Sequence, residues 1–445
     1  MTTGRHRQLR RVAASSMVGT TIEWYDFFLF GLCAALVFPG VFFPAGNEQA
    51  ATLGSFATFG VAFLARPLGA AVFGHFGDRL GRKTSLIATL LLMGIATFCI
   101  GLVPSYDTIG IAAPFLLAVL RICQGFALGG EWGGAALLAV EHAPKGRRGF
   151  YGVFSQLGNP LGYFAANGVL QVIVFAVSEE AFLAWGWRIG FLFSGVLVLV
   201  GLYMRLNVTD AAVFKQAKES DDTAKPRVPL VALVRDHWRV LAASVLLQAS
   251  FSLGAYGLIT YFGSYAQTEL KVPSSWVLIA GMVGALASMP AYVVFSRLSD
   301  RIGRRPVYAI GICSWLVMAY PFYALVRTGT LWGLVLASVI AWTLGHAGTY
   351  AVQSSFLAEL FPTRIRYTGV AMSYQLSSVL WSAPTGFVAA WLFATTGTVY
   401  SVSTLVAASA VLSLLALPML KETKERGLGD EGEEVTDTET AEATR

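Results

Sequence analysis

The chain has 445 residues, of which 55% are hydrophobic, 13% are aromatic and only 13% are charged. Because soluble globular proteins carry about 25% charged residues, this composition excludes an ordinary soluble domain and indicates a membrane protein. The formal net charge of +6 does not indicate a nucleic-acid partner, because the basic residues lie in short segments between apolar stretches. That distribution is typical of the cytoplasmic loops of a protein embedded in a lipid bilayer.

Apolar stretches recur along the whole chain, each long enough to cross about 30 Å of hydrocarbon as a helix. The first is not expected to be a cleaved signal, since it is long and carries two acidic residues. The predicted spans are, in chain order, 17–43, 53–77, 86–103, 110–140, 149–177, 188–206, 239–268, 275–299, 306–326, 330–360, 366–394 and 398–420. The sequence therefore predicts an all-helical integral membrane protein with twelve transmembrane helices.

The basic residues also predict the orientation of the chain. They cluster before the first span, after spans 2, 4, 8 and 10, between spans 6 and 7, and after span 12. The opposite loops hold almost none beyond Lys271 and Arg327. We therefore expect the even-numbered loops and both termini to be cytoplasmic.

Two motifs occur once in each half of the chain. FGDRLGRK at 76–83 recurs as LSDRIGRR at 298–305, a shift of 222 residues (298 − 76), and EHAPKGRRG at 141–149 is echoed by ELFPTRIRYTG at 359–369. Such repeats predict two parallel six-helix bundles. The expected organisation is a cytoplasmic N-terminal tail 1–16, a first bundle 17–206, a cytoplasmic linker 207–238, a second bundle 239–420 and an acidic cytoplasmic tail 421–445, which we expect to be disordered.

Five motifs carry a resemblance to a known family. They are EWYDFF at 23–28, FLARPLG at 63–69, GHFGDRLGRK at 74–83, RICQGFALGGEWGGAA at 121–136 and WGWRIGFLFS at 185–194. Over essentially its whole length the chain resembles the major facilitator superfamily, and within it the metabolite:proton symporter family. Among members of that family, its motif sequences are most similar to those of shikimate permeases. The resemblance implies a monomeric carrier in a bacterial plasma membrane. It would import a small carboxylate or zwitterion with protons as the coupling ion, by alternating access around a mid-membrane cavity, without another cofactor.

The duplicated loop is the first candidate for a functional site. Asp78 and Arg82 lie where the second span turns into the third, and Asp300 and Arg304 hold the matching place in the second half. We expect these four residues to form a cytoplasmic gate that holds one half against the other in the outward-open state. The alternative is that they only set the topology and cap helices.

Ionisable residues at membrane depth are the second candidate, because a charge inside a bilayer is costly and usually functional. Those in the first half are Glu23, Asp26, Arg66, Arg121 and Glu131. We expect one of the three carboxylates to take the coupling proton and Arg121 to bias the exchange. Arg66 would anchor an acid or meet the substrate carboxylate. The alternative is a structural ion-pair network that does not titrate.

The second half lacks these charges, since the 222-residue shift sets Asp26 against Gln248 and Arg66 against Ser288. It is therefore expected to supply neutral hydrogen bonds and aromatic walls. Polar side chains on single helical faces give the candidate substrate-binding residues, which are Arg66, Gln156, Asn159, Tyr163, Gln248, Tyr256, His346, Tyr350 and Gln375. For each of them, hydrogen bonding between helices is the alternative role, and for His346 simple packing.

The sequence favours transport of an organic acid over other functions. The sequence has no HExxH, GxSxG or Cys/His cluster, so neither an enzyme nor a metal site is expected. The four cysteines fall far apart in apolar runs and are expected to be free thiols. Uptake of a dicarboxylate such as 2-oxoglutarate, or of a compatible solute such as proline or betaine, remains as an alternative. A non-transporting receptor is disfavoured.

Overall fold

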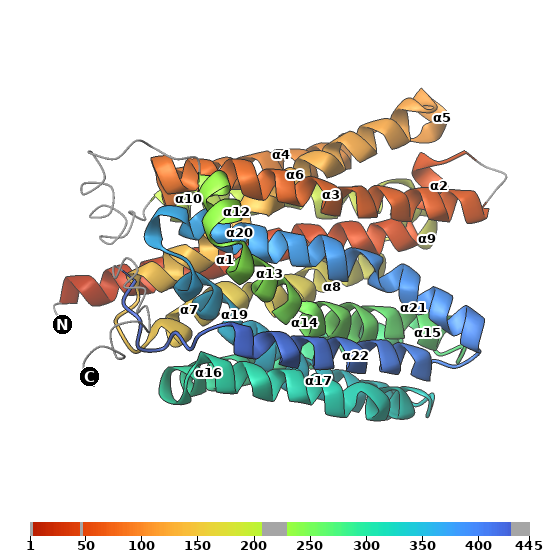
Figure 1. The fold of residues 1–445 in the computed structure, drawn as a ribbon. Coiled ribbons are helices and arrows are strands. Elements are labelled where there is room, and N and C mark those ends of the chain that lie inside the picture. The colour runs from red at the N-terminus through yellow and green to blue at the C-terminus, as the bar shows by residue number, and fades with distance from the viewer. Residues whose placement is uncertain (1–2, 45–47, 207–228, 429–445) are drawn as a thin grey trace, which may run out of the picture.

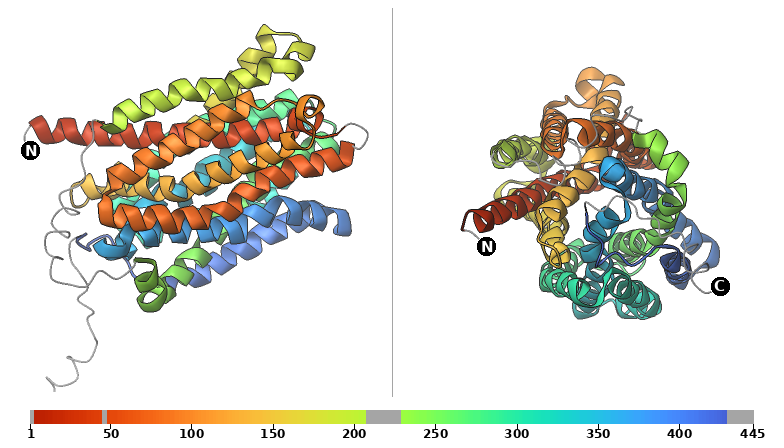
Figure 2. Two further views of the ribbon diagram at one scale, coloured as in Figure 1. Left: turned by 90° about the horizontal axis from the view of Figure 1, so that it is seen from above. Right: turned by 60° about the vertical axis from the view of Figure 1, so that its left-hand side comes forward.

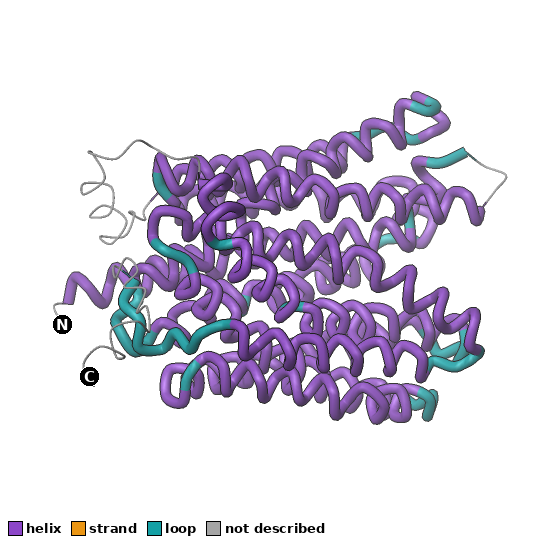
Figure 3. The backbone as a smooth tube through the Cα atoms, in the orientation of Figure 1, coloured by secondary structure: helices purple, strands orange, loops and turns teal. Residues whose placement is uncertain are grey.

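The computed structural model describes residues 3–44, 48–206 and 229–428, and within these ranges it contains helices and no strand. The long helices run side by side along one axis (Figures 1 and 3). Large apolar side chains such as Phe115, Phe175 and Phe387 are exposed on the outside of the bundle. A surface of this kind suits lipid rather than water.

The helices of the first half alternate long spans with short connecting turns. They are α1 (Thr3–Leu36), α2 (Phe38–Phe42), α3 (Glu48–Leu80), α4 (Arg82–Leu102), α5 (Tyr106–Ile109), α6 (Ala112–His142), α7 (Arg148–Gln156), α8 (Gly158–Ala176), α9 (Glu179–Ala181), the π-helical turn η1 (Phe182–Gly186) and α10 (Trp187–Leu206).

The second half is more often interrupted by π-helical turns. Its elements are α12 (Pro229–Asp236), α13 (Trp238–Leu247), α14 (Ala249–Gly254), η2 (Ala255–Thr260), α15 (Tyr261–Thr268), α16 (Ser274–Ile302), α17 (Arg304–Val326), α18 (Leu331–Ile340), η3 (Ala341–His346), α19 (Ala347–Leu360), η4 (Thr363–Ile365), α20 (Arg366–Ser377), η5 (Ser378–Ser382), α21 (Ala383–Thr396), α22 (Tyr400–Ala416) and η6 (Leu417–Met419).

In the described ranges, 10 helical stretches are long and apolar enough to cross a membrane. The other two predicted spans correspond to α1, which carries Glu23 and Asp26, and to α7 with α8, which meet at Leu157. A helix therefore lies at each of the twelve predicted spans.

The structure differs from the sequence prediction mainly at the ends of segments. The helix of the first span already begins at Thr3, inside the predicted tail 1–16, and it breaks at Val37, so 17–43 is not one helix. The predicted linker contains the short helix α12, while 207–228 lies outside the described residues. The predicted disorder of the acidic tail concerns 429–445, which also lies outside them.

Both copies of the duplicated motif turn sharply at a glycine. Gly81 ends the turn from α3 to α4 with φ 120°, and Gly303 does the same between α16 and α17 with φ 111°. Side chains other than hydrogen disfavour this backbone conformation. The start of α1 lies at the same end of the bundle as these turns (Figures 1 and 2). We call this end of the bundle the latch end.

Several helices of one half pack against helices of the other. α3 packs against α20, α7 against α16 and α19, and α8 against α16. Within the first half, α3 and α6 approach closely because Gly125 and Gly129 of α6 face the α3 backbone. Small residues allow such an approach in membranes, where packing rather than the hydrophobic effect holds helices together.

We expect Gly129→Val to destabilise the protein by about 1–3 kcal/mol or more, because the added carbon atoms would meet the backbone of Arg66 and Ala70. Thermal unfolding of the purified protein in detergent measures this loss. Gly60→Val is the matched control, since Gly60 lies in α3 with open space beside it. Equal melting temperatures for the two variants would contradict this close packing.

Candidate functional site

Asp78, at the end of α3, binds the beginning of a helix in the other half. Its carboxylate accepts hydrogen bonds from the backbone N–H groups of Tyr367 (3.1 Å) and Thr368 (3.0 Å) and from the Thr368 hydroxyl (2.8 Å). These N–H groups belong to the first turn of α20, where helices leave donors unsatisfied and carry partial positive charge. Arg82 orients the carboxylate through an ion pair of 2.9 Å.

Asp300 makes the same contact with the two halves exchanged. It accepts hydrogen bonds from the N–H groups of Gly149 (2.8 Å) and Phe150 (2.9 Å), at the beginning of α7, and pairs with Arg304 at 2.8 Å. Each half therefore caps a helix of the other half. Asp78 and Asp300 therefore join the halves and cap helices through the same contacts, and the role of the motif as a gate stays a prediction.

Sequence reasoning missed two glutamates of this cluster. Glu141 pairs with Arg82 at 3.3 Å and, across the halves, with Arg366 at 3.4 Å. The equivalent Glu359 pairs with Arg304 and, across the halves, with an arginine of α7, Arg148, at 3.6 Å. Both copies of the second repeated motif contain a glutamate followed seven residues later by an arginine, which are Glu141 with Arg148 and Glu359 with Arg366. This repetition could have identified the four residues from the sequence. The charged residues of this cluster are together called the latch, and they are Asp78, Arg82, Glu141, Arg148, Asp300, Arg304, Glu359 and Arg366.

Asp26 lies deep in the first half, fully buried between α1, α4 and α10. Its two carboxylate oxygens accept hydrogen bonds from Thr97 (2.9 Å) and Ser194 (2.5 Å). The Thr97 hydroxyl in turn accepts one from Gln124 (2.7 Å), whose side-chain oxygen accepts from Arg121 (3.0 Å). A polar chain thus connects Asp26 to Arg121 without an ion pair between them.

Arg121 is surrounded by aromatic rings instead of carboxylates. Its guanidinium lies 4.1 Å from the ring centre of Phe30, 4.9 Å from Phe59 and 5.5 Å from Phe27. Its Nε and Nη2 atoms are buried without a hydrogen-bond partner. Such cation–π contacts offset part of the cost of burying the charge, but they leave donors available for an acceptor.

Glu131 is already paired, with a residue that the sequence inventory omitted. Both of its oxygens bind the guanidinium of Arg205 on α10, and Thr89 donates a further hydrogen bond of 2.5 Å. Arg205 falls inside the predicted span 188–206, close to its end, and was not counted among the charges at membrane depth. Its position in an apolar run was the signal that could have identified it.

Glu23 differs from its neighbour on α1, because its buried Oε2 has no hydrogen-bond partner. The charges that act on Glu23 are those of Glu131, Arg66 and Arg205. Although Glu23 and Asp26 were expected to share a helix face, they have different surroundings. Only Asp26 reaches the hydroxyls of α4 and α10.

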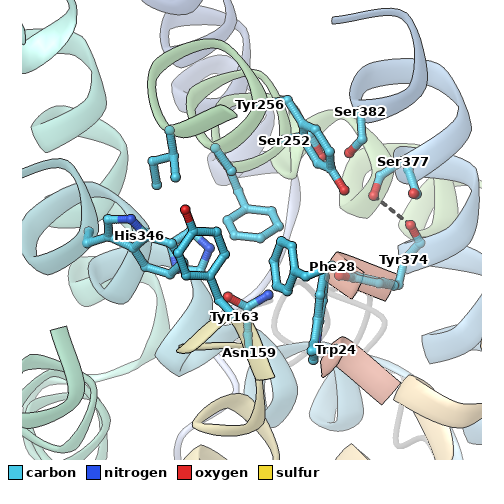
Figure 4. A pocket seen from close by; sticks show the side chains of 15 residues that line it. Trp24, Phe28, Asn159, Tyr163, Ser252, Tyr256, His346, Tyr374, Ser377 and Ser382 are labelled. Atoms are coloured by element: carbon cyan, nitrogen blue, oxygen red, sulfur yellow. Dashed lines mark hydrogen bonds between the residues drawn. The ribbon is translucent and has the colours of Figure 1, made fainter. Parts of the chain in front are cut away.

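A pocket lies between the two halves, with lining residues from both (Figure 4). It is lined by Trp24 and Phe28 of α1, Asn159 and Tyr163 of α8, and residues of the second half, namely Phe251, Ser252, Ala255, Tyr256, Ile259, Trp342, His346, Tyr374, Ser377, Ser378 and Ser382. Trp24 Nε1, Trp342 Nε1 and Asn159 Oδ1 are buried without a partner. Three residues that line the pocket therefore carry a polar atom without a partner, two of them donors and one an acceptor.

Four of the predicted substrate-binding residues line this pocket, namely Asn159, Tyr163, Tyr256 and His346. Arg66 lies behind the wall, where it donates to Ser378 across the halves at 3.1 Å and stacks 4.1 Å over Phe63. Its Nε atom has no partner.

The other four predicted residues make hydrogen bonds between helices instead of lining the pocket. Gln156 donates to the carbonyl of Tyr350 at 2.9 Å, and the Tyr350 hydroxyl accepts from Trp132 at 2.8 Å. Gln375 donates to the carbonyl of Leu128 at 3.1 Å. These bonds cross the halves, whereas Gln248 bonds only within the second half, to Ser244, Ser373, Gln353 and Ser377.

Three π-helical turns of the second half meet at the pocket, and no sequence pattern predicted them. η2 contributes Tyr256, η3 contributes His346 and η5 contributes Ser378. A π turn rotates the following residues relative to an α-helix and is frequent at functional sites.

Comparison with known proteins gives one consistent result. The sequence model of the Major Facilitator Superfamily matches residues 16–373. The chain is 41% identical over 430 residues to the inner membrane metabolite transport protein YhjE of Escherichia coli K12, covering 94% of this chain and 95% of that protein. It is 39% identical over 416 residues to the shikimate transporter of the same organism, with 93% and 95% covered.

A third relative, the proline/betaine transporter of Escherichia coli K12, is 35% identical over 431 residues, with 95% of this chain and 85% of that protein covered. Among solved structures, the proton:xylose symporter XylE bound to 6-bromo-6-deoxy-D-glucose superposes with a TM-score of 0.75 at 17% identity, covering 96% of this chain and 98% of that one. The latter likeness establishes a shared fold.

We expect Arg205→Leu to cost about 3–5 kcal/mol of stability, because it leaves Glu131 as a buried charge without its cation. The double variant Glu131→Gln/Arg205→Leu should lose less, since no unpaired charge remains. Thermal unfolding of the purified variants measures both. Arg235→Leu is the control, because the Arg235 side chain is 77% exposed. A double variant no more stable than Arg205→Leu would argue against the pairing.

Proposed function

The chain belongs to the Major Facilitator Superfamily of membrane transporters, and we propose that within it the protein is a proton-coupled symporter that imports a small organic acid such as shikimate. The observation that carries this proposal is Asp26, a fully buried carboxylate held by two hydroxyls and by no cation. A carboxylate of this kind binds a proton in dry surroundings and releases it when a cation or water reaches it.

We place the transporter in the plasma membrane of a bacterium, with the latch end in the cytoplasm. The basic loops predicted to be cytoplasmic lie at that end, and a relative is described as an inner membrane protein. In this orientation the closed latch separates the pocket from the cytoplasm. Alternating access then requires the latch to open after the substrate has bound from outside.

Proton movement is assigned to the polar chain between Asp26 and Arg121. In the present arrangement Gln124 and Thr97 keep the two charges apart. If the helices shift so that Arg121 contacts Asp26 directly, the cation stabilises the carboxylate and expels its proton. Glu131 is a weaker candidate than the sequence suggested because Arg205 already neutralises it, and Glu23 remains as a second one.

The substrate is assigned to the pocket, where Arg66 supplies the charge. A carboxylate that displaces the Ser378 hydroxyl would reach the guanidinium of Arg66, and its hydroxyl groups would meet the unpartnered donors of Trp24 and Trp342. A monoanion that moves with one proton is electroneutral, so the pH gradient alone would drive its accumulation. A single cation favours a monocarboxylate over a dicarboxylate such as 2-oxoglutarate.

Uptake of a compatible solute such as proline or betaine is the second candidate function. The pocket has aromatic rings on several sides, among them Trp24, Phe28, Tyr163 and Trp342, and such rings attract the ammonium group of a zwitterion. Radiolabelled uptake into proteoliposomes with an imposed pH gradient, compared across shikimate, benzoate, 2-oxoglutarate, proline and betaine, separates the two. No uptake of any of them would overturn the symporter proposal as stated.

We expect Asp26→Asn to abolish uphill accumulation of shikimate in proteoliposomes while leaving exchange of labelled for unlabelled shikimate in place. The amide keeps the shape of the side chain and cannot carry the proton. Asp107→Asn, at an exposed acid of α5, is the control and should accumulate normally. Normal accumulation by Asp26→Asn would rule out Asp26 as the coupling site.

We expect Arg66→Gln to raise the KM for shikimate by about tenfold or more, because a charge-assisted hydrogen bond contributes about 1.5–3 kcal/mol. Initial rates of uptake at several substrate concentrations give this number. Arg235→Gln, on the exposed surface, should leave the KM unchanged. If Arg66→Gln alters only the maximal rate, Arg66 serves the conformational change and does not bind the carboxylate.

A further inference from the structure

The segment 421–428, which follows the last helix, contacts residues of the latch. Residues 421–428 follow η6 without forming a helix, yet Thr423 and Leu428 are buried. They run across the latch end as the dark blue loop of Figure 1. Nothing in the family resemblance or in the proposed function assigns a role to this segment.

One end of the segment is fixed to the second half by Glu422. Its carboxylate accepts hydrogen bonds from the N–H groups of Arg304 (2.8 Å) and Arg305 (2.9 Å), in the first turn of α17. Burial raises the pKa of Glu422, but the backbone N–H groups of Arg304, Arg305, Lys424 and Thr423 outweigh it and hold the pKa below its ordinary value of 4.5. This contact is therefore complete above that value and is lost only as the pH falls through the lowered pKa.

The middle of the segment reaches a latch carboxylate. The Thr423 hydroxyl donates to Glu359 Oε2 at 2.7 Å, and Glu359 also holds Arg304 and Arg148. Because Glu359 joins residues of both halves, the segment adds a further partner to the cross-half ion pair. It thereby helps to satisfy a buried carboxylate, whose unmet hydrogen bonds would be costly.

The far end of the segment contacts arginines that cross between the halves. Arg148, in α7 of the first half, donates to the carbonyl of Arg426 at 2.6 Å. The carbonyl of Leu428 accepts from Arg366 at 2.7 Å and from Thr363 at 2.7 Å, and Arg366 also reaches Glu141 of the first half. Contacts that join the two halves break when the halves separate, whereas contacts within one half do not.

We propose that residues 421–428 form a strap that stabilises the closed state of the latch end and must be released before the halves separate there. The strap is a conformational regulator built into the chain, distinct from the proton and substrate sites. The proposal takes from the proposed function only that the latch end opens during the cycle. A factor that displaces the strap would raise the open population without touching the pocket.

The test measures the distance between spin labels on the two halves at the latch end. Spin labels are attached at Lys145→Cys and Ile302→Cys, both exposed positions, after the four native cysteines have been changed to serine. Pulsed electron–electron double resonance in nanodiscs measures the distance between the two labels. Glu422→Ala and a truncation after Leu420 release the strap. Glu425→Ala, whose side chain is 85% exposed, and a truncation after Leu428 are the matched controls.

We expect the ratio of long to short distances to rise about tenfold in Glu422→Ala and in the shorter truncation. Releasing the strap removes the charge-assisted hydrogen bond from Arg148 to the Arg426 carbonyl across the halves, and a bond of this kind shifts an equilibrium by roughly that factor. Both controls should match the full chain. Unchanged distances in both release variants, or an equal shift in the controls, would overturn the proposal. Since the measurement needs neither substrate nor proton gradient, a failure of the strap proposal can be told apart from a failure of the proposed substrate or proton coupling.

Discussion

The structure depends on one constraint, which is that a charge in the interior of a membrane protein must be met by other polar or charged groups. The first half meets this constraint in three different ways. Glu131 and Arg205 neutralise each other, Asp26 is held by hydroxyls, and Arg121 lies among aromatic rings. Only the first arrangement is complete, so the other two groups keep the capacity to change partners.

The same constraint explains the latch. The first turn of a helix has N–H groups without intrahelical partners, and α7 and α20 begin at the interface between the halves. Asp300 and Asp78 satisfy these groups from the opposite half, so each helix is properly capped only while the halves are together. Water can replace the caps after the halves separate, which makes the closed state favourable without making it permanent. A transporter needs that balance, because an irreversible latch would stop the cycle.

The sequence predicted the parts of the structure that depend on composition and local repetition. Twelve apolar runs sufficed for the spans, and the duplicated loop motif pointed to four residues at the latch end, whose role as a gate stays a prediction. The partners of the intramembrane charges were not predictable, because they depend on how helices far apart in sequence pack together. Arg205 was missed since it lies near the end of a span, where a basic residue normally marks a loop.

Sharing a helix face did not decide which residues line the pocket. His346 and Tyr350 lie on one face, with their ring centres 5.3 Å apart, yet His346 lines the pocket and Tyr350 does not. Tyr350 instead bonds to Trp132 of the other half. Similarly, Gln156 and Gln375 were read as cavity-lining residues because a polar side chain inside a membrane must face something polar. In both cases that partner is a backbone carbonyl across the interface.

The unequal distribution of charge suggests how protonation and opening are connected. The carboxylates and arginines predicted at membrane depth lie in the first half, while the second half contributes most of the pocket wall. The halves are joined near the pocket by the bond from Arg66 to Ser378 and by Trp132, which stacks on Tyr374 at 4.0 Å. A change of partners at Asp26 alters the packing of α1, and α1 also supplies Trp24 and Phe28 to the pocket. In the proposed mechanism the proton and the substrate therefore act on the same helix, and this shared helix would be the physical link that coupling requires.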